Sequence, residues 1–204
     1  MLEASNLDCQ RGGRTLFRGL SFSLQGGELL RIAGANGSGK TSLLKILCGL
    51  LLPDAGDVRW RGTPIRQLRE DYSRHLVYLG HAPAVKDDLT AAENLTIACA
   101  LAGRTATPQE TKQALDSYGL PASAAPVRRL SQGQRRRAAL ARLLLSADAP
   151  LWLLDEPFAA LDASAARLTE ELIARHLAGG GAVAYTTHQE ANIDAAVRRV
   201  IELG

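Results

Sequence analysis

The segment at residues 34–41, Gly-Ala-Asn-Gly-Ser-Gly-Lys-Thr, constrains the possible fold more than any other feature of the sequence. It follows residues 29–33, Leu-Leu-Arg-Ile-Ala, a predicted β-strand, and leads into residues 40–51, a predicted buried helix. Its spacing is that of a phosphate-binding loop, whose glycines let the backbone wrap closely around a polyphosphate. A glycine-rich turn that merely starts a helix would not need Lys40 and Thr41 together at its end. We therefore expect a nucleotide-binding α/β fold around this loop.

Each part of the loop has an expected role toward ATP. The backbone amides point at the phosphates, and the charge of Lys40 is expected at the β and γ phosphates, where it also serves catalysis. The hydroxyl of Thr41 is expected to bind Mg²⁺. The nucleotide-binding residues predicted in this segment are Gly34, Ala35, Asn36, Gly37, Ser38, Gly39, Lys40, Thr41 and Ser42.

Strand-like and helix-like segments alternate along the chain, which predicts a parallel α/β sheet. Short alternating patterns between residues 5 and 33 predict two or three strands. Residues 83–147 are rich in Ala, Leu, Gln and Glu and are predicted as a helical insert, and an amphipathic helix is predicted at 166–177. Further strands are predicted at residues 58–60, 76–79, 151–154, 182–187 and 198–203.

The 204 residues suffice for one domain with a sizeable core. We predict a single domain whose catalytic lobe comprises residues 1–82 and 148–204, with residues 83–147 as a helical subdomain. The longest apolar run, residues 46–52, is interrupted by Gly49 and is too short to span a membrane. The N-terminus lacks the pattern of a secretory signal, so the chain is expected to stay in the cytoplasm.

The overall charge does not indicate a nucleic-acid-binding protein, because 24 Lys and Arg residues oppose 21 Asp and Glu residues. Six arginines nevertheless crowd into residues 128–142. Successive helix residues point about 100° apart, so these arginines cannot all face one ligand. We expect a solvated helix end with one or two arginines at a contact. Cys9, Cys48 and Cys99 show no metal or disulfide spacing and are predicted as packing residues.

Two adjacent carboxylates close the apolar strand at residues 151–154. A phosphate-loop enzyme places its second Mg²⁺ anchor at such a strand end, which is the role we predict for Asp155. Successive strand residues point to opposite sides, so Glu156 cannot perform the same task. We predict that Glu156 polarises the water in line with the γ-phosphate.

Residues 130–134, Leu-Ser-Gln-Gly-Gln, predict a second anion site. Ser131 with Gln134 three residues later forms a capping box, which starts a helix whose free amides can hold an anion. Here the sequence resembles the ATP-binding cassette family. The family signature is read at Ser131, Gln132, Gly133 and Gln134, its Walker A at 34–41, its Walker B at 151–155, its D-loop at 160–162 and its switch histidine at His188.

The resemblance implies an α/β phosphate-loop NTPase with a mostly parallel central sheet, an N-terminal antiparallel β subdomain and a helical insert subdomain. It implies an ATPase that binds ATP and Mg²⁺ and forms a head-to-tail homodimer. In the family pattern, Lys40 of one chain and Ser131 and Gly133 of the other hold the same ATP. His188 is then expected to contact the γ-phosphate.

Three positions depart from the family pattern. The aromatic residue that stacks on adenine is replaced by Arg11, whose guanidinium plane can also stack on a base or can be an exposed charge. The glutamine expected after strand 76–79 is absent, and His81 takes its place by spacing as a metal ligand and a link to a membrane partner. Ala159 replaces the usual serine before the D-loop.

Within the family, the motif combination in so short a chain looks like the ATP-binding subunit of the cytochrome c maturation haem exporter. This similarity implies a peripheral protein on the cytoplasmic face of the inner membrane, assembled with integral membrane subunits, that drives haem transfer to a periplasmic chaperone. Haem is expected as the transported substrate and not as a ligand of this chain, and no nucleic-acid partner is expected. The alternatives are another small-molecule exporter, or a cytosolic cassette protein that remodels nucleic-acid or ribosomal complexes through the arginines at 128–142.

Overall fold

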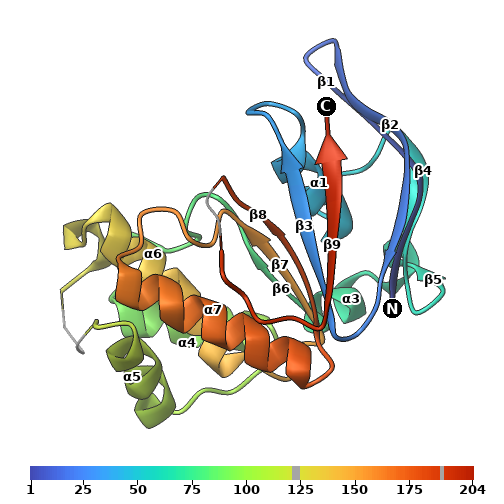
Figure 1. The fold of residues 1–204 in the computed structure, drawn as a ribbon. Coiled ribbons are helices and arrows are strands. Elements are labelled where there is room, and N and C mark those ends of the chain that lie inside the picture. The colour runs from blue at the N-terminus through green and yellow to red at the C-terminus, as the bar shows by residue number, and fades with distance from the viewer. Residues whose placement is uncertain (121–124, 189–190) are drawn as a thin grey trace.

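The computed structural model describes residues 1–120, 125–188 and 191–204. The chain forms two sheets with one helix between them and a group of helices on the far side of the second sheet (Figure 1). The first sheet is antiparallel and has the strand order β2-β1-β4-β5. Its strands are β1 (Leu2–Arg11), β2 (Arg14–Leu24), β4 (Ala55–Trp60) and β5 (Thr63–Pro64).

The second sheet has five strands, all parallel, in the order β6-β7-β8-β3-β9. Parallel strands end at the same edge of a sheet, so the loops that follow β3, β6, β7 and β8 lie along one edge. These loops carry the phosphate-loop motif, His81, the acidic pair and His188. The strands are β3 (Glu28–Gly34), β6 (Leu76–Leu79), β7 (Leu151–Asp155), β8 (Ala182–Thr186) and β9 (Val197–Leu203).

The helices start where the sequence supplies a capping side chain or a phosphate-loop turn. Thr90, Thr107 and Ser131 each close a capping box, and Asp162 caps the longest helix. The α-helices are α1 (Lys40–Leu47), α2 (Ile65–Leu68), α3 (Glu70–Arg74), α4 (Ala91–Leu101), α5 (Pro108–Ser117), α6 (Gln132–Leu140) and α7 (Ala163–Ala178), with 3-10 turns η1 (Val127–Arg129) and η2 (Ala141–Leu145).

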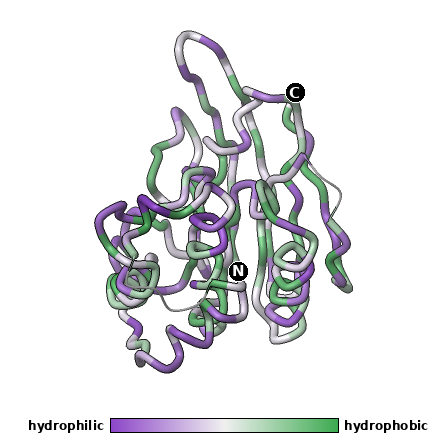
Figure 2. Tube along the Cα trace, turned by 90° about the vertical axis from the view of Figure 1, so that its left-hand side faces the viewer, coloured by the Kyte–Doolittle hydropathy of each residue, from purple (hydrophilic) through white to green (hydrophobic). Residues whose placement is uncertain are grey.

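Each face of the parallel sheet packs into a different core. Alternate residues of β7 show this, because Leu153 packs with α1 and the antiparallel sheet while Trp152 packs with the helices. Figure 2 shows hydrophobic and hydrophilic stretches interspersed along the tube. The predicted α/β architecture with an antiparallel N-terminal sheet is confirmed. The division of the chain at residues 83 and 147 stays a prediction.

The helix after the phosphate loop is shorter than its apolar sequence suggests. We predicted a helix over 40–51, but α1 ends at Leu47, and Gly49 adopts a positive φ of 79°. Glycine reaches this conformation without the steric cost that other residues incur, so the chain turns away from the core here. Leu50, predicted as a core residue, is 68% exposed. Within the described part of the chain, no helix is long and apolar enough to cross a bilayer.

Candidate functional site

The phosphate loop forms an open cradle at the carboxyl end of β3. Gly34, Gly37 and Gly39 have positive φ values of 141°, 80° and 105°, which only glycine adopts readily. A side chain at Gly34 would collide with the carbonyl oxygen of Leu203, 2.2 Å from the ideal Cβ position. The tip of the loop, residues 35–37, is exposed. The loop therefore presents its backbone toward a ligand because its sequence excludes side chains that would fill the curl.

The ammonium of Lys40 lies inside this curl. Its Nζ donates hydrogen bonds to the carbonyl oxygens of Gly34 at 2.8 Å and Ala35 at 2.9 Å, and the residue is buried. The nearby Oγ of Ser38 is buried and has no hydrogen-bond partner among the described residues. An unpaired buried hydroxyl is costly, so this atom suits a ligand that accepts or donates a hydrogen bond in the cradle.

The carboxylate of Asp155 is fixed by two hydroxyl groups. Oγ1 of Thr41 donates to its Oδ2 at 2.8 Å, and Oγ1 of Thr186 donates to its Oδ1 at 2.7 Å. The second contact follows from the sheet register, which pairs Asp155 with Thr186 on neighbouring strands. Asp155 is 1% exposed. The predicted neighbours Thr41 and Asp155 are thus brought together, and Thr186 is a partner that the sequence did not reveal.

Glu156 lies beside His188. Its Oε1 is 3.4 Å from Nε2 of His188, and its Oε2 accepts a hydrogen bond from the backbone N–H of His188 at 3.3 Å. Oε1 is buried and accepts no hydrogen bond from the described residues. The backbone of Glu156 has a φ of 52°, in the left-handed region where a residue with a side chain is strained. A carboxylate with a free acceptor next to an imidazole is arranged to bind and polarise a water.

The signature segment begins α6 as the sequence predicts. Oγ of Ser131 accepts from the N–H of Gln134 at 3.2 Å, while Oε1 of Gln134 accepts from the N–H of Ser131 at 2.8 Å. Ser131 and Gln132 are exposed at the helix N-terminus. Gly133 packs against the D-loop, because a Cβ there would lie 2.8 Å from the carbonyl oxygen of Ala160. The helix end therefore faces outward, where a second molecule could reach it.

Arg11 and His81, two of the departures from the family pattern, lie in different parts of the fold. The Arg11 side chain is 40% exposed, and its guanidinium donates to the carbonyl oxygen of Leu52 at 3.2 Å and lies 3.5 Å from the carboxylate of Asp54. It lies at the tip of the β1–β2 hairpin, and its role in stacking stays a prediction. His81 is exposed after β6, and its carbonyl oxygen accepts a hydrogen bond from Arg136 at 3.3 Å. Its role as a metal ligand also stays a prediction.

The donor set suits a hard cation bound together with a phosphate. A hydroxyl and a carboxylate meet at Thr41 and Asp155, and oxygen ligands of this kind are those that Mg²⁺ prefers. Among the described residues, no group of three His, Cys, Asp or Glu side chains could hold a metal ion. In phosphate-loop enzymes, phosphate oxygens and water supply the other ligands of such a cation.

The arginine-rich segment contains a residue that sequence reasoning missed. We expected a solvated helix end with one or two arginines at a contact, and Arg136 makes such a contact: it is only 4% exposed and donates to carbonyl oxygens at the ends of β6 and β7. Arg137 instead approaches Asp162 of the D-loop at 3.6 Å, and Arg135 pairs with Asp87 at 2.8 Å. The sequence offered no signal that distinguishes Arg136 from its two neighbours.

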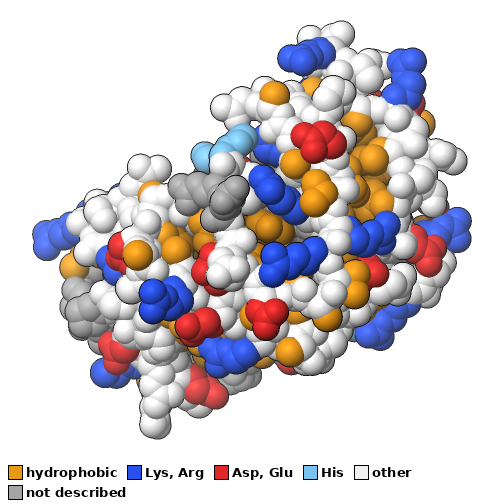
Figure 3. Space-filling view, viewed as in Figure 1, with side chains coloured by type: hydrophobic (Ala, Val, Ile, Leu, Met, Phe, Trp, Pro, Cys, Tyr) orange, Lys and Arg blue, Asp and Glu red, His pale blue; other side chains and the backbone are white. Residues whose placement is uncertain are grey.

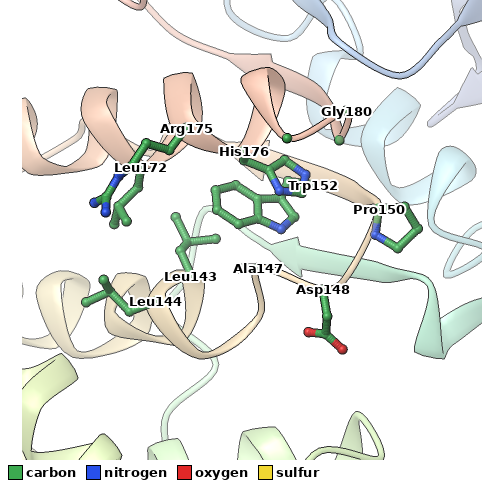
Figure 4. A pocket seen from close by; sticks show the side chains of 12 residues that line it. Leu143, Leu144, Ala147, Asp148, Pro150, Trp152, Leu172, Arg175, His176 and Gly180 are labelled. Atoms are coloured by element: carbon green, nitrogen blue, oxygen red, sulfur yellow. The ribbon is translucent and has the colours of Figure 1, made fainter.

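A separate cavity of about 510 Å³ lies at the opposite end of β7, away from the phosphate loop (Figure 4). Trp152 and His176 stack in its wall with ring centroids 3.9 Å apart and an angle of 5° between the rings. Burial lowers the pKa of His176 to about 4, so this imidazole is neutral at physiological pH. His176 is therefore a neutral core residue that stacks on Trp152.

Basic and acidic side chains are interspersed over the face seen in Figure 3. Arginines of the segment 128–142 also pair with carboxylates, including Arg128 with Asp88. Paired charges of both signs do not make the continuous basic stripe that nucleic-acid backbones attract. This observation gives the nucleic-acid alternative no support.

The comparisons with known proteins agree with this geometry. A family model described as "ABC transporter" matches residues 17–159. A Nitrosomonas europaea protein named "Cytochrome c biogenesis ATP-binding export protein CcmA" is 54% identical over 191 residues, covering 93% of this chain and 89% of that protein. A protein of the same name from Dechloromonas aromatica is 49% identical over 205 residues, with full coverage of both. A solved dimeric bacterial ABC transporter cassette superposes with a TM-score of 0.81 at 23% identity, covering 93% of this chain and 88% of that one.

Proposed function

This chain belongs to the ABC transporter family and is an ATPase subunit, and we propose that it drives haem export in cytochrome c biogenesis as the ATP-hydrolysing partner of separate membrane subunits. The observation that carries the proposal is the meeting of four loops at one sheet edge, in a chain about half identical to export proteins of that pathway over nearly its whole length.

The chemistry at this edge divides among four side chains. Lys40 binds the β and γ phosphates within the loop, and Glu156 accepts the proton of the attacking water through its free Oε1. His188 lies close enough to orient that carboxylate and to contact the γ-phosphate. Asp155 accepts a hydrogen bond from Thr41 and positions the cation shell. When Mg²⁺ is bound there, it neutralises charge that develops on the transferred phosphoryl group.

A second copy of the chain completes the site. The loop and the acidic pair cover one side of a triphosphate, while the exposed N-terminus of α6 supplies free amides on another surface of the same chain. Two chains related by a twofold axis would place Ser131, Gln132, Gly133 and Gln134 of each against the ATP held by the other. The solved relative with the same fold is dimeric, which supports this arrangement.

The transport partners lie outside this chain. The two relatives quoted above are named as export proteins, and the described residues include no helix that could itself cross a bilayer. We therefore assign the membrane passage to integral subunits and place this chain on the cytoplasmic face of the inner membrane. Haem is the transported or transferred substrate, handled by those subunits and delivered to a periplasmic chaperone.

The proposal is tested by isolating the assembly from membranes and identifying its subunits and its substrate. We expect the chain to co-purify with integral membrane proteins, and an ATP-dependent increase in haem bound to the periplasmic chaperone in reconstituted vesicles. The Glu156→Gln assembly, with equal subunit content, serves as the control without hydrolysis. ATP-dependent export with no haem transfer would indicate another small-molecule exporter. Salt-dependent affinity for RNA without membrane association would indicate the nucleic-acid alternative.

A further inference from the structure

We propose that Arg136 is a positioning residue for ATP hydrolysis, which holds the Glu156 backbone in its strained conformation and ties it to the signature helix. The inference rests on the proposed role of Glu156 as the base. Arg136 is then the group that orients the Glu156 carboxylate, and it connects that carboxylate to α6.

The guanidinium of Arg136 joins two strand ends. Its Nη1 donates to the carbonyl oxygens of Gly80 at 2.7 Å and His81 at 3.3 Å, both in the loop that follows β6. Its Nη2 donates to the carbonyl oxygens of Asp155 at 2.6 Å and Glu156 at 2.7 Å, at the end of β7. One side chain therefore contacts four backbone carbonyls at the ends of two neighbouring strands of the sheet.

The positive charge of Arg136 is buried against backbone carbonyl groups. Arg136 is 4% exposed, and its contacts are carbonyl oxygens and not a paired carboxylate. Burial lowers the pKa of the guanidinium, an effect that the nearby charges of Asp155 and Glu156 oppose. Its Nε has no hydrogen-bond partner among the described residues. A buried cation with an unpaired donor is costly, so the carbonyl contacts must hold it firmly in place.

The contact with Glu156 stabilises a conformation that the residue would otherwise avoid. Glu156 has a φ of 52°, and such strain persists only where surrounding contacts determine it. Its N–H donates to Oγ1 of Thr186 at 2.9 Å, and its carbonyl oxygen accepts from Arg136, so both sides of its backbone are fixed. The turn at Glu156 directs the side chain to His188. Loss of the guanidinium would free the carbonyl side of this turn.

Arg136 also connects the catalytic carboxylate to the second ATP contact. It lies on α6, whose N-cap is Ser131, so the residue that contacts the partner's ATP and the residue that holds Glu156 belong to one short helix. A shift of α6 against β7 would lengthen the carbonyl contacts of Arg136. Hydrolysis in one site is thereby linked to the position of the helix that contacts the other, and to the loop at Gly80 and His81.

The test uses Arg136→Lys and Arg136→Ala in the full-length chain. Lysine keeps the charge but lacks the planar fork that reaches both strand ends. We expect kcat for ATP to fall at least about tenfold in both variants, while the affinity for Mg·ATP stays within about twofold. Methylguanidinium added to Arg136→Ala is expected to restore part of kcat, and thermal unfolding reports the folded fraction of each variant.

Arg135→Gln is the matched control. Arg135 precedes Arg136 on the same helix and also donates to carbonyl oxygens, but these belong to Leu130 and Arg128 and not to the catalytic strands. We expect this variant to keep kcat within about twofold. A parental kcat in Arg136→Lys and Arg136→Ala overturns the inference. A loss that follows ATP affinity or folded fraction, with no rescue by methylguanidinium, also overturns it. Parental hydrolysis by Glu156→Gln would instead overturn the proposed base.

Discussion

The hydroxyl of Thr41 donates a 2.8 Å hydrogen bond to Oδ2 of Asp155, across a sequence separation of 114 residues. The opposite carboxylate oxygen accepts from Thr186. The phosphate loop is thus joined to the end of β7 by side chains. This link determines how a cation can be held between the loop and the sheet.

Thr41→Val is expected to weaken Mg·ATP binding about tenfold while changing the affinity for metal-free ATP much less. The substitution keeps the shape of the side chain and removes the oxygen that would bind Mg²⁺. Thr41→Ser, which keeps the hydroxyl, is the control and should bind as the parent does. ATP titrations with Mg²⁺ and with a chelator provide the measurement. Equal weakening under both conditions would assign Thr41 to the loop structure alone.

Glu156→Gln is expected to lower kcat by about 10²- to 10⁴-fold with nearly unchanged ATP affinity, because the amide keeps the shape but cannot accept the proton of water. Steady-state phosphate release and equilibrium nucleotide binding check the two quantities. Glu171→Gln, at an exposed position of α7, makes the same chemical change away from the site. Near-parental phosphate release by Glu156→Gln would remove this residue from the base role.

Arg11→Ala is expected to weaken ATP binding about 2- to 30-fold, as the loss of a guanidinium stacked on a base predicts. Arg11→Tyr should restore the affinity, since tyrosine supplies a ring at the same hairpin tip. Arg14 is the exposed neighbour paired with Arg11 across the hairpin, so Arg14→Ala controls for net charge. Equal ATP affinity in the parent and both Arg11 variants would show that Arg11 only binds Leu52 and Asp54.

Mixed dimers test whether the two ATP contacts act across the interface. Lys40→Ala and Ser131→Arg homodimers should each fail to occlude ATP, because every composite site in them carries a defect. In the heterodimer both defects fall in one composite site, so about one ATP per dimer should be occluded. Glu156→Gln in both chains slows hydrolysis, so that the occluded ATP lasts long enough to be counted by filter binding. Purified mixed dimers that occlude no more ATP than the parents would contradict the roles of Ser131 and Gly133.

The buried His176 predicts a loss of stability in mild acid. Its pKa is lowered from 6.5 to about 4 by burial, so below pH 6.5 the unfolded chain binds a proton that the folded chain does not. This contribution to stability is complete above pH 6.5 and is lost as the pH falls toward 4. Its full size is about 1–3 kcal/mol. Urea unfolding from pH 7 to pH 4 should show a shallower loss in His176→Phe, which keeps an aromatic ring against Trp152. Identical pH profiles would place the acid sensitivity elsewhere.

The local elements could be predicted because their causes are local. The glycines of residues 34–39 predict the phosphate loop, and the pair Ser131 and Gln134 predicts the start of a helix. Alternating apolar residues predict the strands. The predicted end of helix α1 at residue 51 was wrong, because the apolar run continues past Gly49, where the chain reverses. The phosphate loop and the acidic pair could be placed at one sheet edge because parallel strands share their carboxyl ends.

Only the tertiary structure decided which segments distant in the chain contact one another. Register places Thr186 beside Asp155, and nothing in the sequence around either residue specifies that pairing. Arg135, Arg136 and Arg137 are the same residue type in succession, yet each contacts a different element. Helix geometry sends neighbouring side chains about 100° apart, and which of them meets the sheet depends on how α6 packs. The sequence determined which chemistry the chain carries, whereas packing determined which side chains hold it in place.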